Sequence, residues 1–388
     1  MSEPRFSVLV PTRDRPETLR HTLATVVAQP GEDYEIVVAD NCSSPETSAI
    51  VEALGARRLH YLRSDEVLPM SENWERGLAA CSGEYVTVLG DDDGLVHGAL
   101  RMAGHLLDQT PVEIVSWKPH VYWWPNTIVP WLRNLLIMNM GSGSASCPSR
   151  QVLCDFYAGK LSFGMLPPIY NSFFHRSVIE EARQRYDGFF TPRDVAPDVA
   201  SAILGLHITE TYLFSLHPFS IRGNSGKSNG TAQWMRSLGA EQRAAYFRDE
   251  RLRVEEMMHK DLVASPNLEI VVANAMLKCR ETYFPGDPAL TVDLHQVLHR
   301  MIRDLNREPE SYDENLADIR AFATKLGVPL AAADIPAVQP RERLLEWGPS
   351  VDEYKIVAQL GVNCDLARAY NVADAARIVE AIMPAKTA

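Results

Sequence analysis

The sequence predicts an α/β protein with a mostly parallel central sheet flanked by helices, followed by an α-helical C-terminal domain. Up to about residue 117, short apolar runs alternate with amphipathic stretches, which is the pattern of parallel strands joined by crossover helices. From about residue 236, the strand pattern stops and charged amphipathic stretches take its place. We therefore expect a sheet-containing domain over residues 1–235 and a helical domain over residues 236–388.

Each element has a local signal. Residues 6–10 form an apolar run that Pro11 ends, as in a buried strand, and the stretch 16–28 carries its apolar residues at helical spacing. The expected strands are residues 6–10, 34–39, 59–62, 84–89 and 112–117. The expected helices are residues 16–28, 46–54, 71–81 and 97–108 in the first domain, and 236–263, 290–306, 311–326, 351–360 and 372–382 in the second.

Composition restricts the class of protein. The chain has 388 residues, of which 46% are hydrophobic, so it can bury a sizeable core. Its net charge of −12 argues against a nucleic-acid partner, because phosphate backbones are bound by clustered Lys and Arg. Its six cysteines form no CxxC pair, which argues against a zinc site and a disulfide framework.

Targeting signals are also absent from the sequence pattern. The first strand begins within a few residues of Met1, without a signal-peptide pattern. The longest apolar stretch, residues 123–140, is interrupted by Pro, Asn and Arg residues. We therefore expect a cytoplasmic protein without a transmembrane segment, and we leave contact with a membrane surface open.

Polar side chains follow the expected strands where each strand ends. Thr12 and Arg13 follow the first strand, Asp40 follows the second, and three aspartates at positions 91–93 follow the fourth. In parallel sheets, ligands bind beyond the carboxyl ends of the strands. The sequence therefore predicts a binding site along this edge of the sheet.

The aspartates at positions 91–93 indicate a metal site. Adjacent carboxylates on a short loop repel one another, and a divalent cation offsets this repulsion. Oxygen ligands suit Mg²⁺ or Mn²⁺, and the same cation would hold two oxygens of a diphosphate. The alternative is an acidic turn or a helix N-cap, where Asp is common. The position after a buried strand favours the metal site.

The other polar residues at this edge suit a nucleotide. Thr12 and Arg13 could contact a base and a ribose, and Asp40 could accept hydrogen bonds from a base imide or a ribose hydroxyl. Each of these segments is also an ordinary turn sequence. Their joint position at one edge favours the nucleotide.

Four segments together resemble the family 2 glycosyltransferases, which have the GT-A fold. They are VLVPTRDRPETL at 8–19, IVVADNCS at 36–43, SENWERGL at 71–78 and SGEYVTVLGDDD at 82–93. The resemblance is close over about the first 110 residues and weaker to about residue 230. It implies a GT-A-like sheet and inverting transfer of a sugar from a nucleoside-diphosphate sugar, with Mn²⁺ or Mg²⁺ as the cofactor.

The resemblance also implies roles for individual residues. Asp40 would lie near the base, Asp91 near the ribose or the sugar, and Arg222 near the diphosphate. The family often has a metal-binding His two residues after this Arg, where Asn224 stands here, so His217 becomes the substitute ligand. The implied nucleotide-sugar-binding residues are Pro11, Thr12, Arg13, Asp40, Asn73, Asp91, Asp92 and Arg222. The implied metal ligands are Asp92, Asp93 and His217. A mobile surface loop is the alternative for residues 217–230.

The resemblance also implies a general base at the start of a later helix. In the matching stretch, 188–204, Asp198 precedes an apolar run and follows Pro197, which replaces the usual acidic neighbour. We assign Asp198 as the catalytic base, with Asp194 in reserve. The alternative is that Asp198 only complements the helix dipole.

Two other classes of function stay open. A sugar nucleotidylyltransferase should have a Gly-rich loop after the first strand, which residues 11–16 lack. A non-catalytic scaffold on a degenerate transferase fold would not need the intact aspartates. Trp123, Trp124 and Trp131 are expected in the core, with stacking on a sugar or an apolar acceptor as the alternative.

The acceptor cannot be read from the sequence. It could be a carbohydrate, a lipid-linked glycan, a natural product or a peptide. The helical domain would serve acceptor binding or oligomerisation, and its long helices are compatible with a homodimer.

Overall fold

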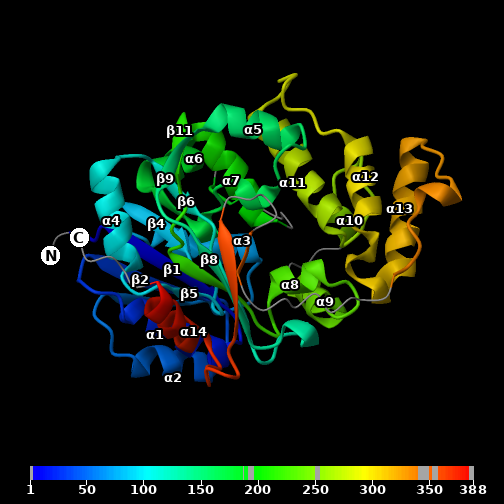
Figure 1. Ribbon diagram of the computed structural model, residues 1–388. Helices are drawn as coiled ribbons and strands as arrows, with labels where there is room; N and C mark the ends of the chain where they lie inside the picture. The colour runs from blue at the N-terminus through cyan, green and yellow to red at the C-terminus, as the bar shows by residue number, and fades with distance from the viewer. Residues whose placement is uncertain are drawn as a thin grey trace.

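A computed structural model describes residues 3–186, 188–190, 196–249, 254–339, 349–351 and 357–383 (Figure 1). In this part of the chain, the larger sheet has eight strands in the order β3-β2-β1-β4-β10-β6-β11-β9. The first four run parallel to one another, and β10 and β9 run antiparallel to their neighbours. The strands are β1 (Phe6–Thr12), β2 (Tyr34–Asp40), β3 (Leu59–Arg63), β4 (Tyr85–Val88), β6 (Ile114–Trp117), β9 (Ser144–Pro148), β10 (Ser172–His175) and β11 (Thr211–Ser215). The expected α/β fold with a mostly parallel sheet is confirmed.

A smaller sheet has the order β13-β14-β8-β7-β12-β5 within the described residues. Its strands are β5 (Gly94–Leu95), β7 (His120–Trp123), β8 (Leu135–Met140), β12 (Ser220–Asn224), β13 (Pro349–Val351) and β14 (Ala358–Asn363). Because β5 follows the three aspartates directly, this sheet reaches the predicted site from the side of β12.

Helices cover both faces of the larger sheet. Every residue of β1 is buried, and its side chains alternate between two cores, as expected for a strand covered on both faces. Leu9 packs into the core that contains α7, and Val8 and Val10 pack into the core that contains α1 and α4. The helices of this part are α1 (Pro16–Val27), α2 (Pro45–Ala53), α3 (Met70–Ala79), α4 (Ala99–Gln109), α5 (Ser149–Tyr157), α6 (Arg176–Tyr186) and α7 (Pro197–Ile208).

A helical region lies to one side of the sheets (Figure 1). Its helices are α8 (Asn229–Trp234), α9 (Ala240–Asp249), α10 (Val254–Met257), α11 (Leu268–Tyr283), α12 (Leu294–Arg303) and α13 (Tyr312–Leu326). α11, α12 and α13 share a separate core, and α11 also packs against α7. In the described residues, no helix is both long and apolar enough to cross a membrane.

The chain then returns to the first part of the molecule. β14 pairs with β8, and α14 (Val372–Ile382) packs against α1. Two expectations are therefore wrong. Residues 358–360 belong to a strand and not to a helix over 351–360, because they gain a partner far away in the sequence. The expected single helix over 236–263 begins only at Ala240 and does not pass Met257, because a tight turn at Gly239 precedes it.

The other expected helices of the second part are confirmed as α12, α13 and α14. The domain boundary near residue 235 stays a prediction. The described segment 357–383, which we had assigned to the helical domain, contributes a strand and a helix to the sheet-containing part.

Candidate active site

The three aspartates form a buried loop between β4 and β5. The exposed fractions of Asp91, Asp92 and Asp93 are 4%, 5% and 9%. Asp91 binds residues that follow β1, whereas Asp92 and Asp93 both bind the end of β12, and these contacts define the site.

Asp91 is held by residues that follow β1. The Thr12 hydroxyl donates to Asp91 Oδ2 at 2.8 Å, and Arg15 Nη1 forms an ion pair with Asp91 Oδ1 at 2.9 Å. The structure thus brings Thr12 to the aspartates, as the sequence predicts. It brings Arg15 there as well, which the sequence reasoning missed in favour of Arg13, because both arginines occupy the same loop.

Asp92 is held by the residue that follows β12. The Ser225 amide and hydroxyl both donate to Asp92 Oδ2, at 3.1 and 2.6 Å. Trp124 Nε1 donates to the Asp92 carbonyl at 2.9 Å. Trp124 is buried, as expected, and its indole therefore also supports the loop. Ser225 carried no signal in the sequence, because its partner lies 133 residues away.

Asp93 is held by backbone amides. Gly223 donates to Asp93 Oδ1 at 2.6 Å, and Gly90 donates to Asp93 Oδ2 at 3.0 Å. A Cβ at residue 223 would lie 1.8 Å from the Asp92 carbonyl oxygen, so only glycine fits at this position. β12 therefore touches two of the three aspartates along its carboxyl end.

Burial makes the negative charge of this loop unfavourable. Loss of water and the neighbouring Asp92 raise the pKa of Asp93 to about 7. Burial also raises the pKa of Asp92, although Arg15 acts against this shift. The chain itself neutralises Asp91 through Arg15, whereas the charge of the other two carboxylates is left without an ion pair in the described contacts. A divalent cation is the chemical group that suits this environment.

The donor set is compatible with Mg²⁺ or Mn²⁺. Among the described residues, no group of three or more His, Cys, Asp or Glu side chains is arranged to hold a metal ion. Mg²⁺ commonly uses one or two carboxylates and takes its other ligands from water and substrate phosphates. Asp92 and Asp93 can meet that requirement without a third protein ligand.

His217 lies away from the aspartates. It precedes β12, whereas Gly223 and Ser225 contact the aspartates at the other end of this strand. From Ser220 to Asn224, β12 spans about 13 Å at about 3.3 Å per residue, so its two ends are well separated. His217 instead lies near His120. Burial of His120, together with the neighbouring His217, lowers the pKa of His120 to about 3. The structure thus does not bring His217 to the aspartate loop.

Asp40 is buried beneath its own neighbours. Its Oδ1 accepts from the Ser43 amide at 2.9 Å, and its Oδ2 accepts from the Tyr61 hydroxyl at 2.5 Å. Pro11 and Thr12 of β1 pair with Ala39 and Asp40 of β2, so Asp40 and Thr12 end adjacent strands, as expected.

Asn73 supports this strand end from α3. Its Nδ2 donates to the Ala39 carbonyl at 3.0 Å, and its Oδ1 accepts from Arg76 at 2.8 Å. Both polar groups of Asn73 therefore bind protein atoms, and its contribution is to hold the backbone before Asp40. Arg13, by contrast, is only partly buried on the loop after β1.

Asp198 is the second residue of α7 and is partly buried. Its charge acts on Tyr170 and on Arg222, and Asp93 acts on the same two side chains. Arg222 is an exposed residue of β12, and the negative charges of both carboxylates act on its guanidinium. Asp198, Asp93 and Arg222 thus face a common region. The reserve base, Asp194, lies outside the described residues.

The loop after β12 crosses the loop after β1. Lys227 Nζ donates to the Asp14 carbonyl at 2.7 Å and lies 3.3 Å from a carboxylate oxygen of Glu17. Arg15 Nη2 donates to the Lys227 carbonyl and to Asn229 Oδ1. The two loops are therefore tied together beside Asp91.

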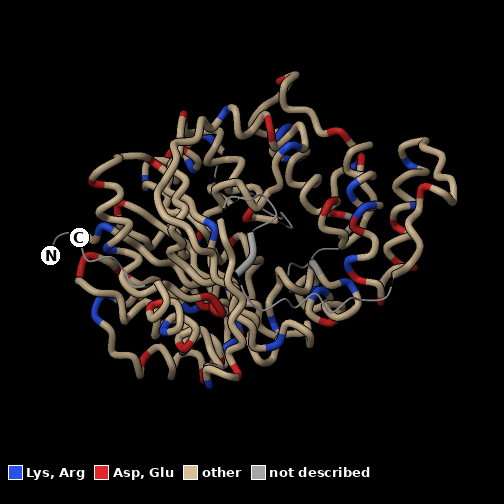
Figure 2. Tube along the Cα trace, in the orientation of Figure 1, with Lys and Arg blue, Asp and Glu red and all other residues tan. Residues whose placement is uncertain are grey.

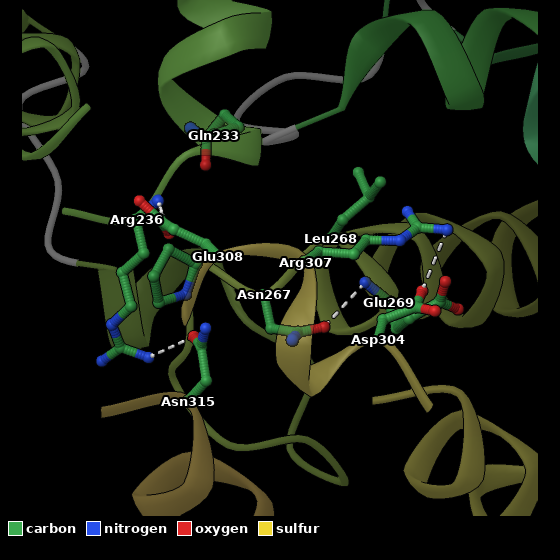
Figure 3. Close-up of a pocket in the computed structure, with 10 residues that line it drawn as sticks. Gln233, Arg236, Asn267, Leu268, Glu269, Asp304, Arg307, Glu308 and Asn315 are labelled. Atoms are coloured by element: carbon green, nitrogen blue, oxygen red, sulfur yellow. Dashed lines mark hydrogen bonds and ion pairs between the residues drawn. The ribbon is translucent and has the colours of Figure 1, made fainter. Parts of the chain in front are cut away.

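A small polar pocket lies elsewhere, in the helical region (Figure 3). Its lining includes Arg236, Asn267, Arg307, Glu308 and Asn315. Arg236 Nη1 donates to Asn315 Oδ1 at 3.3 Å, and Glu308 accepts from the Arg236 amide at 2.6 Å. None of the predicted site residues lines it, so we place the active site at the aspartate loop.

Comparison with known proteins identifies a family for the first part of the chain. Residues 7–154 match the family model described as Glycosyl transferase family 2. A GalNAc(5)-diNAcBac-PP-undecaprenol beta-1,3-glucosyltransferase of Campylobacter jejuni is 37% identical over 100 residues, which are 25% of this chain and 32% of the relative. A PGL/p-HBAD biosynthesis glycosyltransferase of Mycobacterium bovis is 28% identical over 121 residues, which are 30% of this chain and 46% of the relative.

Among solved structures, S. aureus TarS 1–349 in complex with UDP-GlcNAc is 15% identical, with a TM-score of 0.48. That alignment covers 84% of this chain and 93% of TarS 1–349. The chain matches less than half the length of the two curated relatives. The region that matches the family model, residues 7–154, contains β1 from its second residue, β2 to β4 and the whole aspartate loop. Residues 7–154 of this chain are therefore a family 2 glycosyltransferase domain.

Proposed function

We propose that this chain is an inverting glycosyltransferase that moves a sugar from a nucleoside-diphosphate sugar to a hydroxyl or another nucleophile of an acceptor. The observation that carries the proposal is the buried pair Asp92 and Asp93, whose carboxylates accept hydrogen bonds from Ser225, Gly223 and Gly90 and form no ion pair among the described contacts. Such a pair at the carboxyl edge of a parallel sheet suits a metal-bound diphosphate.

Different residues around the aspartate loop would bind different parts of the nucleotide-sugar donor. Thr12 and Asp91 would face the ribose, the strand end at Asp40 would face the base, and Arg222 would bind the diphosphate. Asp92 and Asp93 would hold Mg²⁺ or Mn²⁺. When bound, the cation would stabilise the negative charge of the diphosphate as it leaves.

Asp198 would act as the general base. Its carboxylate would take the proton of the acceptor hydroxyl while the oxygen attacks the anomeric carbon from the face opposite the diphosphate. As the new bond forms, the bond to the diphosphate breaks and its electron pair leaves with the diphosphate. Attack from the opposite face inverts the configuration of the anomeric carbon. The shared influence of Asp93 and Asp198 on Arg222 supports a donor and a base that face one space.

The acceptor is proposed from the relatives. The name of the Campylobacter jejuni relative specifies an undecaprenol-linked glycan. We therefore rank a lipid-linked glycan first, ahead of a free carbohydrate, a natural product or a peptide. The helical region beside α7 is the proposed place for acceptor binding, because α11 packs directly on the helix that carries Asp198.

A calorimetric titration tests the donor site. UDP, GDP and dTDP are each titrated with Mn²⁺ and with EDTA, and one of them should bind only with the metal. A nucleotidylyltransferase would instead release pyrophosphate from a nucleoside triphosphate and a sugar phosphate. Absence of metal-dependent binding for all three nucleotides would contradict the proposal and favour a scaffold.

A further inference from the structure

The described segment 357–383 packs against the elements next to the aspartate loop. β14 pairs with β8 over six residues, from Ala358 opposite Met140 to Asn363 opposite Leu135. α14 then packs against α1 and reaches β5 and β12 (Figure 1). β5 follows Asp93 directly, so this late segment meets the site that the first part of the sequence predicts.

Asn134 anchors the turn that leads to α14. This residue is fully buried, and its Nδ2 donates to Asp365 Oδ1 at 2.7 Å and to the Ala369 carbonyl at 3.0 Å. Its own carbonyl accepts from the Cys364 amide at 3.0 Å. The turn therefore has a defined position on the sheet, and so does the start of α14.

Val372, the first residue of α14, packs against Gly94. A Cβ at Gly94 would lie 2.8 Å from Val372 Cγ2, so the valine leaves no room for a larger residue there. From α1, the Thr22 hydroxyl donates to the Asp93 carbonyl at 2.7 Å, and the Thr25 hydroxyl accepts from the Leu95 amide at 3.0 Å. The backbone after the aspartates is thus held by hydrogen bonds from α1 and by packing from α14.

We infer that Val372 is a positioning residue for the aspartate loop, which it holds in the geometry that binds the metal and the diphosphate. The inference rests on the proposed function for its catalytic meaning, but not for its structural content. Two buried, like-charged carboxylates tend to separate, so their loop needs rigid support. Because Val372 touches the backbone next to Asp93, it supplies that support.

The test compares Val372→Ala with Val379→Ala. Both valines are buried on α14, at 0% and 1% exposure, and lie about 10 Å apart at 1.5 Å per residue. Both variants should lower Tm by similar amounts. Only Val372→Ala should speed hydrogen exchange of the amides of residues 90–95, by about tenfold. It should also raise the donor KM more than it lowers kcat.

A second pair of variants separates a local effect on the aspartate loop from general destabilisation of the fold. Gly94→Ala should loosen the loop by itself. Gly94→Ala with Val372→Ala should exchange more slowly than Gly94→Ala, because it removes the 2.8 Å overlap with Val372 Cγ2 and leaves only the milder 3.3 Å approach to Thr25 Cγ2. Equal exchange at residues 90–95 in the Val372 and Val379 variants, or no rescue in the double variant, would overturn the inference. If the wild type binds none of the three diphosphates with Mn²⁺, the proposed function fails, and the exchange data still decide this inference.

Discussion

The aspartate loop and the helical region both contain carboxylates that are largely shielded from water, but these differ in their arginine partners. Among the described contacts, one of the three aspartates of the loop, Asp91, forms an ion pair with an arginine. Arg236 forms an ion pair with Asp318 at 2.5 Å, and Arg300 forms one with Glu269 at 2.6 Å. Figure 2 shows Lys or Arg beside Asp or Glu along these helices.

In the aspartate loop, Asp92 and Asp93 accept hydrogen bonds from Ser225, Gly223 and Gly90, none of which carries a charge. A carboxylate that is paired with an arginine within the protein is expected to have a structural role. A buried carboxylate without such a pair is a candidate for binding a ligand. The comparison therefore separates a structural network from a binding site, and variants in each region should behave in opposite ways.

The largest effect is expected for Asp92→Asn. Turnover should fall about 100-fold or more, because stabilisation of the leaving diphosphate is lost. Asparagine keeps an oxygen that can accept from Ser225, so the loop should persist. Initial rates are measured with a sugar donor that carries the nucleotide found to bind in the calorimetric titration. Turnover equal to that of the wild type would contradict the metal assignment.

The same variant should stabilise the metal-free protein. The folded-state pKa of Asp92 is raised, so its ionised form is less favourable in the folded protein than in the unfolded one. Asparagine removes that unfavourable charge, so Tm in EDTA should rise at pH 8. The gain should shrink as the pH falls toward the ordinary aspartate range, because the wild type then takes up the proton. A lower Tm at pH 8 would show that the carboxylate is a structural group.

Asp198→Asn should reduce turnover about 100-fold to 10,000-fold, the usual contribution of a general base, and leave donor affinity unchanged. Rate measurements and nucleotide calorimetry on one preparation check both parts. Weaker donor binding with normal turnover would assign Asp198 to the donor and place the base elsewhere.

Glu308→Gln should show the opposite behaviour to Asp92→Asn. Glu308 accepts from the Arg236 amide and from the Ser237 amide and hydroxyl, at 2.6, 3.0 and 2.8 Å. The carboxamide cannot accept at both ends, so one buried donor loses its partner, at a loss of about 1–3 kcal/mol in the free energy of unfolding. Urea unfolding measures this loss. A change in nucleotide affinity would show that the two regions are coupled.

The smallest effect near neutral pH is expected at His120. Burial lowers its folded-state pKa from 6.5 to about 3. Between these values the unfolded state binds more protons, so the free energy of unfolding should fall as the pH drops from 6.5 toward 3. His120→Gln should show a flatter dependence in urea unfolding at pH 7 and pH 5. An unchanged slope would assign the acid sensitivity to other groups.

Much of the first part of the molecule was readable from local patterns. The strands over 6–12 and 34–40 and the helix over 372–382 appear where the sequence predicts them. A strand buried on both faces is a continuous apolar run, and a helix with one buried face has apolar residues at helical spacing. Thr12 and the aspartates could be placed at one edge because parallel strands bring their carboxyl ends together.

The partners of those aspartates could not be predicted in this way. Ser225 and Gly223 meet Asp92 and Asp93 across 133 and 130 residues, and Val372 meets Gly94 from the far end of the chain. Likewise, residues 358–363 form a strand only because β8 offers an unpaired edge. Local spacing determines which residues are buried. Long-range packing determines which residues bind a given carboxylate, because those residues come from segments that are far apart in the sequence and follow no periodic pattern.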